Sequence, residues 1–79
     1  MSANSEKYSL AFVEAFGVDV SAVESLEYQK INEWDSVGHM GLIAQLEEAF
    51  NIQIAMDDVI EFGSFEKGKV ILGKYGITF

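Results

Sequence analysis

Apolar residues recur at helical spacing near the start of the chain. Five of them stand one, three or four positions apart: Tyr8, Ala11, Phe12, Ala15 and Phe16. This spacing predicts a helix over residues 5–16. Asn4 or Ser5 can cap its start, and Gly17 can close its end.

A second helix is predicted from Asp35, a good N-cap residue, to Phe50. At 100° per residue, one side carries the expected core face: Leu42, Ile43, Leu46, Ala49 and Phe50. Val37, Met40 and Ala44 form a second apolar stripe on nearly the opposite side. A helix with two apolar stripes either buries both or presents one of them to a partner.

The last third of the chain predicts two more helices. Residues 56–62 form a short one, with Asp57 and Asp58 in its first turn, where the helix dipole favours acids. Ser64 caps the next, whose expected buried stripe is Phe65, Gly68, Ile71, Leu72 and Tyr75. Residues 51–54 alternate in polarity, but a single strand would have no partner, so we expect a packed connection there.

Residues 17–34 show no sustained period. They are nevertheless too apolar for a free linker, so we expect this segment to pack against the helices. The capping-box spacing of Ser21 and Glu24 predicts one short helical turn within it. The sequence therefore predicts an all-α domain over residues 1–79, a four-helix bundle with a long first loop and a short third helix.

Composition narrows the functional classes. The 79 residues are 49% hydrophobic and contain no cysteine, so packing must hold the fold together without disulfides. The net charge of −8 argues against a nucleic-acid partner. The chain has no stretch apolar enough to span a membrane and no secretory start, so we expect a cytoplasmic monomer. Residues 31–66 hold acids but no lysine or arginine, which predicts either a solvated surface or a docking field for basic partners.

The most distinctive group of polar residues is Asp35, Ser36 and His39 at the start of the second helix. A hydrolase triad needs an aspartate that orients the histidine from its far side, together with an oxyanion hole. An aspartate adjacent to the serine on a small bundle offers neither, so we expect no catalytic residue. We expect His39 to be a partly buried, hydrogen-bonded side chain and Trp34 to be a core or loop anchor.

The stretch "WDSVGHMGLIAQLEEAFNIQI", followed by "DD", closely resembles the signature region of acyl carrier proteins. The order of helices, the long first loop and the terminal "KYGI" are also similar to that family. The resemblance implies that Ser36 is the attachment site of 4′-phosphopantetheine, added from coenzyme A by a phosphopantetheinyl transferase. The chain would then be a stand-alone, non-catalytic carrier of acyl or aminoacyl thioesters in a fatty-acid, polyketide, specialised or polysaccharide pathway.

The resemblance also implies the residues that partners contact. Asp35 would help to position the transferase, and Val37, Met40 and Ala44 would form the apolar centre of a docking face. Four acids would meet basic patches on loading ligases or transferases and on synthase-type enzymes: Glu47, Glu48, Asp57 and Asp58. A small acidic adaptor or inhibitor that uses the same surface without modification is the alternative.

Two glycines depart from the family pattern. Gly38 and Gly41 lie inside the second helix, where each costs about 1 kcal/mol relative to alanine. One hypothesis is that they allow close backbone approach by a narrow set of partners. The other is that these surface positions tolerate glycine.

Overall fold

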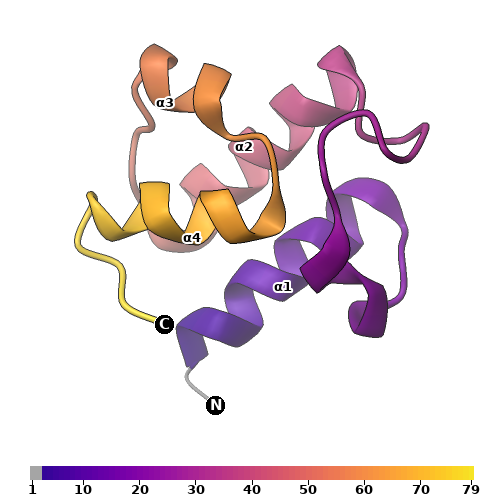
Figure 1. The fold of residues 1–79 in the computed structure, drawn as a ribbon. Helices are drawn as coiled ribbons and strands as arrows, with labels where there is room; N and C mark the ends of the chain where they lie inside the picture. The colour runs from indigo at the N-terminus through magenta and orange to yellow at the C-terminus, as the bar shows by residue number, and fades with distance from the viewer. Residues whose placement is uncertain (1–2) are drawn as a thin grey trace.

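The structure, a computed structural model, describes residues 3–79 and contains four α-helices and one 3₁₀-helix in that range. In order, they are α1 (Ala3–Phe16), η1 (Val20–Ser25), α2 (Ser36–Phe50), α3 (Met56–Glu61) and α4 (Phe65–Gly73). No strand occurs among the described residues, so the all-α prediction is confirmed. α1 packs along α2, and in the view of Figure 1 α4 lies above the N-terminal part of α1, with α3 above α4.

The sequence predicts N-caps for four helices, and the structure confirms those of α2 and α4. The carboxylate of Asp35 accepts a hydrogen bond from the Gly38 N–H (2.8 Å), and the hydroxyl of Ser64 accepts one from the Lys67 N–H (2.9 Å). Both caps satisfy N–H groups that the first helical turn leaves without partners. These bonds place the first residues of α2 and α4 where the sequence predicts them.

At the other two places the caps differ from the predictions. α1 begins at Ala3, so Asn4 and Ser5 lie inside the helix, and Asn4 donates to the Thr78 carbonyl (3.0 Å) instead of capping. The helical turn predicted within the loop is η1. Its N-cap is Asp19, which accepts from the Ser21 N–H (2.9 Å), rather than the Ser21 of a capping box. The Ser21 hydroxyl also donates to the Asp19 carboxylate (2.8 Å), so Ser21 serves here as a donor to the cap residue.

Each α-helix contributes buried side chains to the core. On α2, Leu42, Ile43 and Leu46 are buried as predicted, but Ala49 is exposed and Phe50 is only half-buried. Ala49 lies at a surface hollow that it lines together with Lys7, Leu10, Ala11 and Glu14 of α1. On α4 the predicted stripe is buried, except for Tyr75, which is half-buried and lies beyond the helix end.

The long segment before α2 packs against the helices, as predicted. Val23, Leu26 and Trp34 are buried, and two backbone hydrogen bonds join this segment to the start of α4: Tyr28 N–H to Gly63 O (2.9 Å) and Phe65 N–H to Leu26 O (3.0 Å). Residues 51–54 form a connection without a strand, and Ile54 is buried.

Tyr8 and Gly68 join α1 to α4. The buried Tyr8 hydroxyl donates to the Phe65 carbonyl (2.6 Å), and burial, together with the nearby Glu66 charge, raises the pKa of Tyr8. Gly68 lies directly beneath the Tyr8 hydroxyl and the Phe62 ring, so that a Cβ at this position would overlap both. The absence of a side chain at Gly68 therefore allows α4 to approach the core.

We predict that Gly68→Ala destabilises the fold by about 1–3 kcal/mol, because the added methyl group overpacks the core. Gly73 is the matched control, since a Cβ there would meet no atom within 4 Å. Chemical denaturation of the two variants measures the difference. Equal stability of Gly68→Ala and Gly73→Ala would contradict the close approach.

Candidate functional site

Ser36 is the first residue of α2, and its side chain is exposed. Asp35 caps the helix through the Gly38 N–H, and the Asp35 carbonyl accepts the His39 N–H (2.8 Å). The cap leaves the N–H groups of Ser36 and Val37 without a partner in the helix. A negatively charged group on the Ser36 oxygen would therefore lie beside free N–H groups at the positive end of the helix dipole.

Gly38 is needed inside the protein itself. A Cβ on Gly38 would overlap the Glu33 carbonyl oxygen and lie 3.1 Å from the Glu33 carbonyl carbon and 3.3 Å from the Phe16 ring. The backbone before Asp35 therefore presses against the first turn of α2. This internal contact explains why a glycine stands at position 38. Both hypotheses from the sequence, close approach by a partner and tolerance at the surface, placed the explanation outside the fold. Around Gly41, by contrast, the space is open, and the structure gives no reason for a glycine there.

His39 is half-buried and hydrogen-bonded, as predicted. The Trp34 indole Nε1 donates to His39 Nδ1 (2.9 Å), and His39 Nε2 lies 2.7 Å from the Val59 carbonyl oxygen. Trp34 is fully buried and its ring lies 5.1 Å from that of Phe16, which confirms its prediction as an anchor.

The structure does not assemble a triad from Asp35, Ser36 and His39. The Asp35 side chain caps Gly38, while both ring nitrogens of His39 face partners other than Ser36. The side chains of Asp35 and His39 are therefore engaged in separate interactions, and neither interaction involves Ser36. Within residues 3–79, no group of three or more acidic or histidine side chains could hold a metal ion.

A pocket of about 450 Å³ opens beside Ser36, between α2 and α3. Most of its lining is aromatic, aliphatic or thioether in character: Tyr28, His39, Met40, Met56, Ile60 and Phe62. Such walls offer an apolar group shelter from water, and the Ser36 oxygen lies at the same pocket. Ser36 thus combines access from solvent with an adjoining apolar space.

Exposed apolar side chains lie on α2 and α3, and three of them, Met40, Met56 and Ile60, line this pocket. Val37 is 81% exposed and Met40 is 52% exposed, and Ala44 is also exposed, so the second stripe of α2 faces outward. α3 adds Met56 (67%) and Ile60 (74%), which sequence reasoning missed. We call these five residues the apolar face. The i, i+4 spacing of Met56 and Ile60 was a signal that could have found them.

The four acids that the resemblance assigns to partner binding fall into two groups among the described residues, those without an ion pair and those bonded within the chain. Glu48 and Asp57 are exposed and form no ion pair within residues 3–79. Glu47 is half-buried, and its carboxylate accepts the Ile54 N–H (2.9 Å). Glu48 and Asp57 therefore carry the charge that is freest to meet a partner.

Asp58 is also engaged within the chain. Its carboxylate accepts from the Lys74 ammonium (2.5 Å) and the Tyr75 hydroxyl (2.6 Å), and that hydroxyl accepts the Ala55 N–H (2.8 Å). The hydrogen bonds from Lys74 and Tyr75 lower the pKa of Asp58. The hydrogen bond to Asp58 raises the pKa of Lys74 and that of Tyr75. This cluster attaches the start of α3 to the end of α4.

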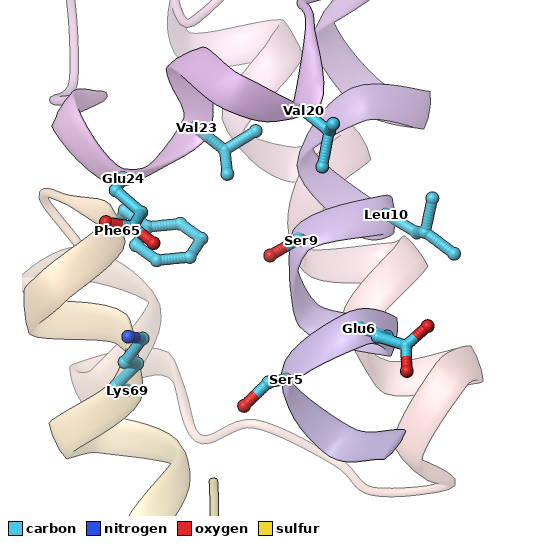
Figure 2. A pocket seen from close by; sticks show the side chains of 9 residues that line it. All are labelled: Ser5, Glu6, Ser9, Leu10, Val20, Val23, Glu24, Phe65 and Lys69. Carbon is cyan, nitrogen blue, oxygen red and sulfur yellow. The ribbon is translucent and has the colours of Figure 1, made fainter. Parts of the chain in front are cut away.

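A second pocket of about 440 Å³ lies between α1, η1 and α4 (Figure 2). Its lining includes the apolar side chains of Phe65 and Val23 and the charged side chains of Glu24 and Lys69. The Lys69 ammonium lies 4.9 Å from the centre of the Phe65 ring. No residue of α2 lines this pocket, so it is separate from Ser36.

Among the helices of residues 3–79, none has the length and the apolar character that a membrane span requires.

The contact at Gly38 predicts opposite effects for two substitutions in one helix. Gly38→Ala should destabilise the fold by about 1–3 kcal/mol, because the methyl group collides with the Glu33 backbone. Gly41→Ala should stabilise it by about 0.5–1 kcal/mol, because the site is open and alanine favours the helix. Denaturant titrations measure the free energy of unfolding of both variants. If Gly38→Ala stabilised the protein, the contact between Gly38 and Glu33 would be ruled out.

The Asp58 cluster predicts a pH-dependent difference between the wild type and Asp58→Asn. A folded-state pKa below the ordinary carboxyl value of about 3.9 means that Asp58 adds stability above that pH. The stability is lost as the pH falls through the lowered pKa. Wild type should therefore be more stable than Asp58→Asn at pH 6, and the difference should shrink in acid. A difference that stays constant down to pH 2.5 would show that the charge of Asp58 is not involved.

No family model, no curated protein and no solved structure matches this chain. Its function is therefore argued from its own residues and geometry. The exposed Ser36 beside an apolar pocket is the feature on which that argument rests.

Proposed function

We propose that this protein is a stand-alone carrier, modified on Ser36 with 4′-phosphopantetheine and without catalytic activity of its own. The observation that carries the proposal is the placement of Ser36, which is exposed at the first residue of a helix and adjoins an apolar pocket. The order of the helices, with a long packed first loop and a short α3, supports an arrangement similar to that of acyl carrier proteins.

The residues around Ser36 fit the proposed group. The Ser36 hydroxyl is accessible to the active site of another enzyme, and the N–H groups of Ser36 and Val37 can face a phosphodiester. When attached, 4′-phosphopantetheine supplies the thiol that this cysteine-free chain lacks, and acyl or aminoacyl groups are held on it as thioesters. Asp35 keeps Ser36 at the helix start, and the pocket gives an apolar cargo a place to shelter.

The apolar face supports recognition by partner enzymes. Three of its five side chains, Met40, Met56 and Ile60, line the pocket that Ser36 also lines, so a partner that covers them lies beside the modified serine. The free acids Glu48 and Asp57 favour basic docking patches and speed encounter, while each exposed ion pair adds about 1 kcal/mol or less. Binding of this kind is brief and sensitive to salt, which suits a carrier that visits several enzymes. Loading ligases or transferases and synthase-type enzymes are the proposed partners.

The apolar face also favours the second candidate, an adaptor or inhibitor that binds partners without modification. That function needs the face but not the Ser36 hydroxyl. The two candidates therefore differ in whether a transferase modifies the chain.

Co-expression with a promiscuous phosphopantetheinyl transferase, followed by intact mass measurement, separates them. We expect the wild type to gain one phosphopantetheinyl group and Ser36→Ala to gain none. Ser21→Ala, which alters an exposed serine in η1, is the control and should be modified like the wild type. An unmodified wild type would favour the adaptor.

A further inference from the structure

Few side chains of this protein are readily oxidised. The sequence contains no cysteine, three methionines and one tryptophan. Trp34 is fully buried, whereas Met40 and Met56 are exposed, and Met1 lies outside the described residues. Because a thioether must meet the oxidant in solvent to react, a peroxide reaches Met40 and Met56 directly, with no thiol on the chain to compete for it.

The two exposed methionines line one pocket from two helices. Met40 on α2 and Met56, the first residue of α3, both line the pocket of about 450 Å³ beside Ser36. Met40 also follows Ser36 by four residues, which places the two side chains on neighbouring turns of one helix face. A chemical change at either sulfur therefore alters the lining of this pocket.

The other polar groups along the pocket are largely bonded within the protein. His39 accepts from Trp34 at Nδ1 and lies at hydrogen-bond distance from the Val59 carbonyl at Nε2. The Gly63 carbonyl accepts the Tyr28 N–H (2.9 Å). An apolar occupant leaves these groups paired as they are. The thioethers suit such an occupant as well, because they need no hydrogen bond.

We propose that Met40 and Met56 are oxidation sites that control the entry of apolar groups into the pocket beside Ser36. The oxidant is hydrogen peroxide. The thioether sulfur takes one oxygen atom from it, so that an S–O bond forms and the O–O bond breaks. The sulfur loses two electrons, and the peroxide is reduced to water. The product, methionine sulfoxide, is polar where the thioether was apolar.

A sulfoxide oxygen accepts hydrogen bonds and stays hydrated in water. An apolar group that covers it removes this water without replacing the bond, which is costly. Oxidation therefore closes the pocket to apolar groups, while the core, which contains neither methionine, is left intact. Methionine sulfoxide reductases reverse the change. That the pocket shelters a carried group rests on the proposed function, but the oxidation and its effect on the pocket do not.

The test uses the unmodified full chain, with hexanol as a neutral apolar probe. Methyl NMR at Val59 and Ile60 follows binding in this pocket, and Val23, which lines the separate pocket of Figure 2, is the control position. We expect hexanol to shift the Val59 and Ile60 signals of the untreated wild type. Absence of these shifts would overturn the proposal, because the pocket would then not admit apolar groups.

Mild treatment with hydrogen peroxide should add one oxygen atom to Met40 and one to Met56, as measured by intact mass and peptide mapping. The Kd for hexanol at Val59 and Ile60 should then rise about tenfold, the ratio that corresponds to one lost hydrogen bond. The response at Val23 should not change. An unchanged Kd in the oxidised protein would overturn the proposal.

The double variant Met40→Leu/Met56→Leu is the matched control, because it keeps Met1 and Trp34. It should bind hexanol like the wild type and keep its Kd after peroxide treatment. A double variant that loses affinity on treatment would overturn the proposal, since another side chain would then be responsible.

Reduction of the oxidised wild type gives a test that needs no variant. Methionine sulfoxide reductases with dithiothreitol should remove both oxygen atoms and restore the Kd. A Kd that stays raised after both atoms are removed would trace the loss to another lesion and contradict the proposal. A chain that no phosphopantetheinyl transferase modifies would leave all of these results unchanged, so the failure of the proposed function is distinguishable.

Discussion

Burial of Trp34 is the interaction on which the arrangement around Ser36 depends. The indole is fully buried against Phe12 and Phe16, with ring centres 5.5 and 5.1 Å away, and it is hydrogen-bonded to His39. Because Trp34 directly precedes the capping residue Asp35, its burial anchors the end of the long loop where α2 begins. Ser36 then follows at the surface, two residues from a fully buried side chain. The tight contact between Glu33 and Gly38 is part of the same arrangement.

The distribution of charge complements this geometry. The lysines of the C-terminal segment are used within the chain: Lys74 binds Asp58, Lys67 lies 4.0 Å from Glu61, and Lys69 lies over the Phe65 ring. Glu48 on α2 and Asp57 on α3 form no ion pair within the described residues. These two helices therefore carry both exposed apolar side chains and unpaired acids, a combination that fits the brief contacts with basic partners that we propose.

Much of the helical framework could be predicted from the sequence, because it depends on local rules. Apolar spacing and the side-chain caps at Asp35 and Ser64 are short-range features, and the starts of α2 and α4 follow from them. The interactions that shape the site are long-range and could not be read in this way. Whether a glycine at position 38 serves the fold or a partner depends on where the Glu33 backbone lies. The sequence predicts that Asp58 and Glu47 meet partners at the surface. In the structure, Asp58 accepts from Lys74 and Tyr75, and Glu47 accepts from the Ile54 N–H.

We propose that Ser36 receives the thiol on which cargo is held, and because the chain contains no cysteine, that thiol can be measured directly. Purified protein is incubated with a phosphopantetheinyl transferase and coenzyme A, freed of small molecules, and titrated with a thiol reagent. We expect no thiol before treatment, one thiol per chain after it, and none in Ser36→Ala. A treated wild type without a thiol, or a Ser36→Ala variant that acquires one, would show that Ser36 is not the attachment site.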